Sequence, residues 1–169
     1  MKFLAISITL TCLLLPFFST AQDSSRKKIA ITKTSALVKI DGDLSEEVWK
    51  QLPAADKFVE LRPTPFRPES NENRSEIYFH YNKDGIYVGG YLHEKTKDSI
   101  ASELNGRDGF GNNDFIGVIF DTYNDKINGF EYFITPLGEQ WDAKTTAGNE
   151  DFSWNAVWQS ASKIHADGW

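Results

Sequence analysis

The spacing of apolar and polar residues predicts an all-β chain with one short helix. Short runs rich in Val, Ile, Tyr and Phe are separated by clusters of Gly, Asp, Asn and Pro, the pattern of strands and turns. The expected strands are residues 36–40, 76–81, 86–92, 115–120, 129–135, 154–160 and 163–165. The turn sequence Asn82-Lys83-Asp84-Gly85 marks a β-hairpin between two of them. Many short strands joined by turns favour an antiparallel β-sandwich of the jelly-roll kind.

One segment has helical rather than strand spacing. Residues 44–52 form a short amphipathic pattern that places Trp49 on the buried side, where we expect a core residue. Asp43 stands at the expected N-cap, and Glu46 follows three residues later, at the spacing of a capping box. The sequence therefore predicts a single short helix near the N-terminus of the sandwich.

The first residues have the layout of a secretory signal peptide. Lys2 gives a positive start, residues 3–18 are almost entirely apolar, and small residues up to Ala21 mark a cleavage site. A run of about 16 residues is short for a bilayer-spanning helix, which needs about 20; a retained N-terminal anchor is the alternative. We therefore expect export to the periplasm, outer membrane or cell surface. The expected organisation is a signal peptide at 1–21, a flexible lead-in at 22–35 and one sandwich domain at 36–169.

Removal of the signal peptide changes the chemistry available to the domain. It would take away Cys12, the only cysteine, so no internal disulfide and no thiolate metal site would remain. It would leave 17 basic side chains against 24 acidic ones. An acidic surface without a basic patch argues against nucleic acid as a partner. It suits a neutral ligand such as a sugar, and the abundant Trp and Tyr suit sugar stacking, although most large aromatic residues pack in cores.

Five blocks in order resemble the carbohydrate-binding module family 9. The blocks are residues 40–49 (IDGDLSEEVW), 77–89 (IYFHYNKDGIYVG), 113–122 (NDFIGVIFDT), 133–142 (FITPLG followed by WD) and 151–158 (DFSWNAVW). The last block, with the later pair Gly168-Trp169, is similar to a subfamily in Bacteroidetes-type bacteria. In that subfamily the module precedes a large region expected to form an outer-membrane β-barrel.

The resemblance implies a jelly-roll-like sandwich that holds a sugar with tryptophan side chains, and structural calcium in some members. Family members continue past the Gly-Trp pair, so it also implies that this sequence is incomplete at its C-terminus. Because one fold hosts many functions, the ligand has to be argued from the site.

Three tryptophans are candidates for stacking on sugar rings: Trp141, Trp154 and Trp158. Trp154 and Trp158 are four residues apart, so an extended strand would place both on one face. That face would be either a platform for two sugar rings or the inner face of the sheet. Trp141 and Trp154 lie near polar, Gly-containing loops, where solvent-facing rings are more common.

A glycine-rich loop over residues 96–113 adds polar candidates. Arg107 and Asp108 are expected to present fixed donors and acceptors to sugar hydroxyls, and Asn113 and Asp114 follow closely. The alternative is a solvated loop with a structural ion pair.

Asp121 and Asp125 are candidate calcium ligands, because they place hard oxygens close together. Ordinary turn chemistry explains acidic residues at these positions equally well. Nothing in the sequence singles out a pair of catalytic carboxylates, and it contains no zinc spacing, nucleophile elbow or phosphate-binding loop. We therefore predict no enzymatic activity for this chain.

The sequence thus predicts non-catalytic binding of an oligo- or polysaccharide by an exported, envelope-associated module that supports polysaccharide breakdown. Two alternatives stay open. One is a structural periplasmic plug or docking domain for the downstream outer-membrane region of the same protein. The other is the targeting arm of a glycoside hydrolase.

Overall fold

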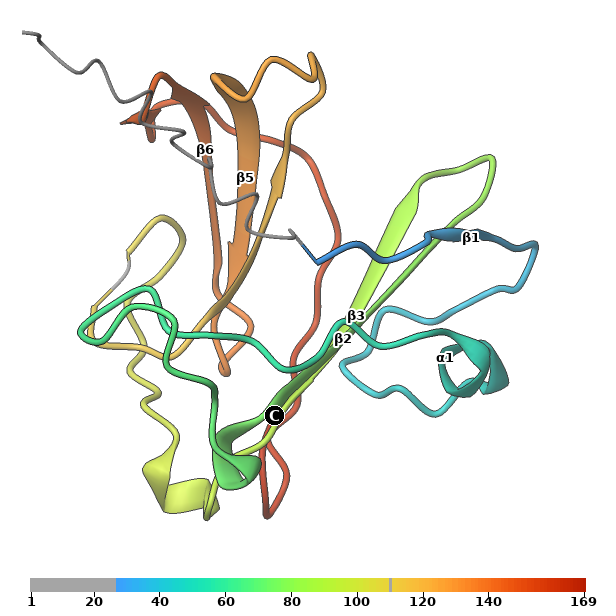
Figure 1. Cartoon of the computed structure of the whole chain (residues 1–169), viewed down its shortest axis with the longest axis vertical. Helices are drawn as coiled ribbons and strands as arrows, with labels where there is room; N and C mark the ends of the chain where they lie inside the picture. The colour runs from blue at the N-terminus through green and yellow to red at the C-terminus, as the bar shows by residue number, and fades with distance from the viewer. Residues whose placement is uncertain (1–26, 110) are drawn as a thin grey trace, which may run out of the picture.

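The computed structural model describes residues 27–109 and 111–169, which form two β-sheets and one short α-helix (Figure 1). The sheets have three and four strands in a sandwich-like arrangement, and every pairing but one is antiparallel. The prediction of an all-β fold with a short helix is confirmed. The predicted signal peptide, its cleavage after Ala21 and the start of the lead-in lie outside the described residues. In the described part of the chain, no helix has the length and apolarity needed to cross a bilayer.

The first sheet contains the predicted hairpin. Its strands are β1 Thr32–Lys33, β2 Ser75–Tyr81 and β3 Ile86–Leu92, in the order β1-β2-β3. β2 and β3 pair antiparallel along their whole length. Asn82 fixes the turn, because its Oδ1 accepts hydrogen bonds from the backbone N–H groups of Asp84 (2.7 Å) and Gly85 (3.1 Å).

The predicted strand at residues 36–40 is wrong. The edge of this sheet is instead β1, a shorter segment that pairs parallel with β2. In the 36–40 segment the backbone N–H of Lys39 donates to the Glu46 side chain at 2.9 Å. A side chain there takes the place of a ladder partner, so the alternating pattern does not become a strand.

Helix α1, Glu47–Gln51, covers the outer face of the first sheet. Trp49 is its buried residue, as predicted, with 6% of its surface exposed. A glycine makes this packing fit, because a Cβ at Gly89 would lie 3.1 Å from the Trp49 ring. The helix therefore packs on the sheet mainly through the indole ring of Trp49.

The cap of this helix differs from the prediction. The helix begins three residues later than expected, and its N-cap residue is Glu46 without a side-chain cap hydrogen bond. Asp43 pairs with Lys163 at 2.6 Å instead of capping. The Glu46 carboxylate accepts from Lys39 N–H and from Trp49 Nε1 at 3.0 Å, and these donors hold the pKa of Glu46 below its usual value.

The second sheet was predicted only in part. Its strands are β4 Ile116–Phe120, β5 Asn128–Ile134, β6 Gln140–Thr146 and β7 Asn149–Asp151, in the order β4-β5-β6-β7. The pairing of β4 with β5 agrees with the sequence. β6 and β7 were missed because they carry mostly polar residues, and the strands predicted at 154–160 and 163–165 are absent.

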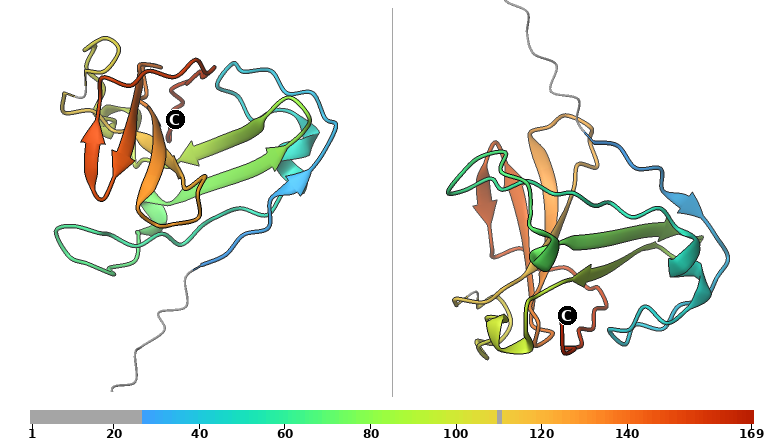
Figure 2. Two further views of the ribbon diagram at one scale, coloured as in Figure 1. Left: turned by 90° about the horizontal axis from the view of Figure 1, so that it is seen from above. Right: turned by 60° about the horizontal axis from the view of Figure 1, so that its bottom comes forward.

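The two faces of this sheet have different surroundings. Ile116 points to the first sheet, where a Cβ at Gly90 would lie 3.0 Å from its Cδ1. By alternation along the strands, Tyr132 and Asp142 share this inner face, and Phe133 and Trp141 share the outer one. The segment that follows β7 crosses on the inner side, between the two sheets (Figures 1 and 2).

Residues near the C-terminus complete the first sheet. Trp169 is 6% exposed and exchanges two backbone hydrogen bonds with Leu92, at 2.9 and 3.0 Å. Tyr91 donates its hydroxyl to Asp167 at 2.7 Å. Segments far apart in sequence therefore meet at the end of β3. The remaining elements are the 3-10 turns η1 Asn71–Asn73 and η2 Lys97–Ser99.

Candidate functional site

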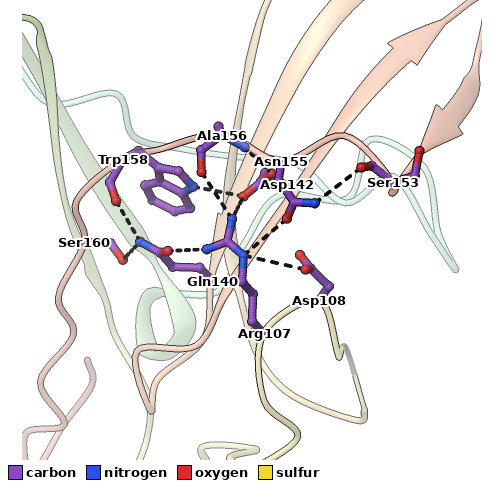
Figure 3. Close-up of polar contacts among 9 residues, drawn as sticks. All are labelled: Arg107, Asp108, Gln140, Asp142, Ser153, Asn155, Ala156, Trp158 and Ser160. Carbon is purple, nitrogen blue, oxygen red and sulfur yellow. Dashed lines mark hydrogen bonds and ion pairs between the residues drawn. The ribbon is translucent and has the colours of Figure 1, made fainter.

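Arg107 is the centre of a polar network at the N-terminal end of β6 (Figure 3). Its Nη1 donates to Gln140 Oε1 at 2.6 Å, and its Nε donates to Asn155 Oδ1 at 3.4 Å. Its Nη2 donates to the Ala156 carbonyl at 3.3 Å and forms an ion pair with Asp142. The predicted partner Asp108 is more remote, at 3.6 Å. The guanidinium thus joins the 101–114 loop, β6 and the segment after β7.

Asp142 is the buried member of this network. Its side chain is fully buried, and its Oδ1 accepts from Ala156 N at 2.9 Å. Its Oδ2 accepts from Arg107 and from Trp158 Nε1 at 3.1 Å (Figure 3). The indole N–H of Trp158 is therefore already used within the protein. Arg107 and Trp158, both candidates for sugar binding, are brought together on the Asp142 carboxylate, and their contacts are those of a structural network.

Asn113 and Asp114 close the base of the glycine-rich loop. Asn113 exchanges hydrogen bonds with the backbone of Glu103, donating to its carbonyl at 2.9 Å. Asp114 Oδ2 accepts from Ala101 N at 2.8 Å. Both side chains act on their own loop, which leaves them little capacity for sugar hydroxyls.

Trp154 and Trp158 share one face, as their spacing predicts. Trp154 lies 4.9 Å from Phe130 and 6.1 Å from Tyr132, measured between ring centroids, and Trp158 lies 5.5 Å from Tyr132. Tyr132 belongs to the inner face of the second sheet, and burial raises its pKa. Both tryptophans are half-buried against the inner face, which is the packing alternative rather than the open platform.

Trp141 lies on the outer face in a row of aromatic rings. It is tilted against Phe133 at 4.4 Å and stacked on Phe152 at 5.0 Å, with 19° between the two planes. Phe115 meets Phe133 edge-on at 5.7 Å. Phe115 and Phe152 are 44% and 43% exposed, while the two central rings are half-buried. We call Phe115, Phe133, Trp141 and Phe152 the outer aromatic row.

A glycine and the strand register explain why these rings lie next to one another. Phe133 pairs with Gly117 on one side and with Trp141 on the other. A Cβ at Gly117 would lie 2.3 Å from the Phe133 ring, so the ring rests on bare backbone. Only glycine leaves this space, and it keeps the row close to the sheet.

Two carboxyl groups flank the row on the same face. Glu131 is two residues before Phe133 in β5, and Glu150 is two residues before Phe152. Glu131 is 4% exposed, and burial together with the nearby charge of Glu150 raises its pKa. Its Oε2 has no hydrogen-bond partner in the described structure. The outer face therefore combines apolar rings with the buried carboxyl group of Glu131 and the exposed carboxyl group of Glu150, which can accept hydrogen bonds.

The candidate calcium ligands are engaged in a turn. The Asp121 carboxylate accepts from the backbone N–H groups of Asp125 (3.1 Å) and Lys126 (2.9 Å). Asp125 accepts from the backbone and side chain of Asn128, and these bonds lower the pKa of Asp125. Across residues 27–109 and 111–169, no three His, Cys, Asp or Glu side chains are arranged to hold a metal. The turn accounts for both carboxylates, and the calcium assignment stays a prediction without support from this geometry.

Comparisons with other proteins add no assignment. No protein-family model matches the chain, and neither a curated protein nor a solved structure is significantly similar to it.

Sequence reasoning identified Trp141 but missed its neighbours in the outer aromatic row. Phe133 lay in a predicted strand, and period-two alternation places it on the same face as Glu131. Phe152 could not be placed, because β6 and β7 were not predicted and only their pairing brings it beside Trp141. The missing signal was the register across three strands.

Proposed function

We propose that this protein binds carbohydrate without catalysis, through the outer aromatic row. The observation that carries the proposal is the near-parallel stack of Trp141 on Phe152, at 5.0 Å and 19°, beside Phe133, tilted by 41°, and Phe115, which meets Phe133 edge-on. The C–H faces of pyranose rings are apolar and stack on such surfaces. Phe152, at one end of the row, is 43% exposed, and a row of several rings suits a chain of sugar units better than a single enclosed ring.

Polar groups beside the rings supply the second requirement of sugar recognition. Sugar hydroxyls that lose water on binding need hydrogen-bond partners. Glu150 lies on the same face, next to the row, and is exposed, whereas the nearby Glu131 is buried. The apolar rings would contribute contact area and the Glu150 carboxyl group would contribute specificity.

The sequence resemblance to carbohydrate-binding module family 9 supports the same function. With it we propose a jelly-roll-like sandwich, export to the cell envelope and an oligo- or polysaccharide as the partner. The role expected in that setting is to hold saccharide near the envelope. A role as the targeting arm of a glycoside hydrolase is compatible with this binding function and requires catalytic residues elsewhere.

The test is a calorimetric titration of the protein with soluble oligosaccharides derived from cellulose, xylan, mannan and chitin. Phe152→Ala removes a 43%-exposed ring and should leave the fold intact. Loss of one stacked ring should weaken binding about tenfold, because an aromatic contact of this kind contributes about 0.5–1.5 kcal/mol beyond its buried area. Trp141→Ala should have at least the same effect.

Trp154→Phe is the matched control, because Trp154 lies on the opposite face of the same sheet. It should leave the affinity unchanged. No binding of any of these saccharides at about 10 mM, a concentration that detects very weak complexes, would refute the proposal. Equal losses in the Phe152 and Trp154 variants would also contradict it, since the effect would then be general.

A second candidate is a docking role for the sandwich against another region of the same protein. It is favoured by Leu61 and Phe66, which are 79% and 80% exposed in the proline-containing loop before β2. Large apolar side chains exposed together mark contact surfaces. In the full-length protein, Leu61→Ser combined with Phe66→Ser should expose this loop to protease. Unchanged cleavage would remove the candidate.

A further inference from the structure

A pocket of about 290 Å³ lies on the outer face of the first sheet, far from the outer aromatic row. It is bordered by α1 on one side and by β2 and the end of β3 on the other. Its walls are Leu44, Trp49, Glu76, Tyr78, Tyr91 and His93. The volume is at the lower end of the range for small-molecule sites, which begins at about 300 Å³, so it suits one small ring.

The aromatic wall of this pocket is held rigid. Tyr91 donates its hydroxyl to Asp167 at 2.7 Å, and its ring contacts His93 at 4.6 Å and His165 at 5.6 Å between centroids. Burial and the hydrogen bond to Asp167 raise the pKa of Tyr91 to about 12, so the phenol keeps its proton. Trp49 is fixed by its hydrogen bond to Glu46. Because these side chains are already ordered, they lose little conformational entropy when a ligand binds.

Polar groups converge on the same space. Glu76 Oε2 lies 3.4 Å from His93 Nε2, and Glu76 Oε1 lies 3.8 Å from Arg74 Nε. The side chains of Glu76 and His93 are 35% and 15% exposed, so both can still reach a ligand. In residues 27–109 and 111–169, no hydrogen bond engages the Tyr78 hydroxyl. The Glu76 carboxylate, the His93 imidazole and the Tyr78 phenol can therefore accept and donate hydrogen bonds to a single small ring bound in the pocket.

The charges around the pocket favour a neutral ligand. The carboxylate of Glu76 opposes an anion, while Arg74 beside it and Lys50 on the rim oppose a cation. Lys50 is itself paired with Glu47 at 3.2 Å. A small neutral molecule with one apolar face and several hydroxyls matches both the aromatic wall and the polar groups. A pyranose has this chemistry.

We propose that this pocket is a second binding site, which takes a single neutral pyranose ring. The Tyr78 and Tyr91 side chains contact the apolar face of the ring, the buried Trp49 supports the floor of the pocket, and Glu76 and His93 bind the hydroxyls of the sugar. The ligand class rests on the proposed carbohydrate-binding function, but the site lies on the other sheet and shares no residue with the outer aromatic row.

The experiment uses the full chain and four monosaccharides: glucose, galactose, mannose and xylose. The ring signals of His93 and the indole N–H signal of Trp49 are followed by NMR during each titration. We expect saturable shifts at these residues with at least one sugar. The combined variant Glu76→Gln with Tyr78→Phe keeps the size of both side chains and should weaken that binding about tenfold or more, because a hydrogen bond to a charged group is lost.

Phe152→Ala is the control, since it alters only the outer aromatic row. It should reduce oligosaccharide binding and leave monosaccharide shifts at His93 and Trp49 unchanged. Oligosaccharide binding at the row with no monosaccharide shift at the pocket up to about 50 mM would overturn this site alone. Failure of every saccharide at both places would overturn the proposed function as well. Wild-type affinity in the folded Glu76/Tyr78 variant would also reject the pocket.

Discussion

The network around Asp142 can be used to test whether Arg107 and Trp158 stabilise the fold. Asp142→Asn keeps the shape of the side chain and removes its charge. The new amide group would present N–H donors toward Arg107 and Trp158, which are themselves donors. Breaking one partner of a buried ion pair costs about 3–5 kcal/mol. Because the Arg107 side chain is 38% exposed, water screens part of that interaction, and we expect a loss of about 2–3 kcal/mol.

The assay is urea unfolding followed by tryptophan fluorescence and circular dichroism. With a denaturant slope of about 1–3 kcal/mol per molar urea, the midpoint should fall by about 0.7–3 M. Asp108→Asn is the matched control, because Asp108 is exposed and only 3.6 Å from the same guanidinium. Its stability should stay within about 0.5 kcal/mol of the wild type.

A double variant completes this test. Arg107→Met leaves the buried carboxylate without its cation and should destabilise the protein by a similar amount. In Arg107→Met combined with Asp142→Asn, the two losses should not add, because both remove the same interaction. Full additivity, or an Asp142→Asn midpoint equal to that of Asp108→Asn, would show that the network does not stabilise the fold.

Two further predictions concern the outer face of the second sheet. Burial, with the charge of Glu150, raises the pKa of Glu131, so its contribution to stability is complete below the unfolded pKa and is lost as pH rises through the folded pKa. Glu131→Gln should therefore raise Tm at about pH 7 and not at about pH 4, and an equal effect at both pH values would contradict this. Gly117→Ala places a Cβ 2.3 Å from the Phe133 ring and should cost about 1–3 kcal/mol in denaturant unfolding. Gly85→Ala, where nothing lies within 4 Å, is its control, and equal stability of the two variants would count against the packing argument.

The sequence was sufficient wherever local chemistry determines structure. The hairpin of β2 and β3 followed from alternation and from the turn at Asn82, whose side chain bonds its own loop. The burial of Trp49 followed from helical spacing. In each case the residues that decide the structure are close together in the chain.

The sequence was insufficient to predict the structure where contacts between distant segments determine it. β6 carries Gln140 and Asp142 on the inner face, and these polar residues hide its strand pattern. They are tolerated there because Arg107 and Trp158 pair with Asp142, from 35 and 16 residues away. The same network explains why the segment after β7 is extended without joining the ladder: its bonds go to side chains.

The residue types of the proposed sugar sites were visible in the sequence, but their grouping was not. Trp141 was chosen because it lies near a glycine-containing turn, yet its stacking partner Phe152 is beside it only through the pairing of β7 with β6. Composition could not distinguish Trp141, on the outer face, from Trp154, which packs on the inner face. Register, and not residue type, separates the two.

The closure of the first sheet by residues 163–169 has a consequence for the order of folding. Tyr91 and Asp167 are 76 residues apart in the chain, and Asp43 and Lys163 are 120 apart. Contacts between such distant residues form slowly, because the intervening chain has to be ordered first. The β2–β3 hairpin is therefore expected to form early in folding. The contact of Asp167 with Tyr91, which we call the clamp on Tyr91, is expected to form late. A molecule that binds only the clamped form would act mainly on the unfolding rate and lengthen the lifetime of the native state, with little effect on the speed of folding.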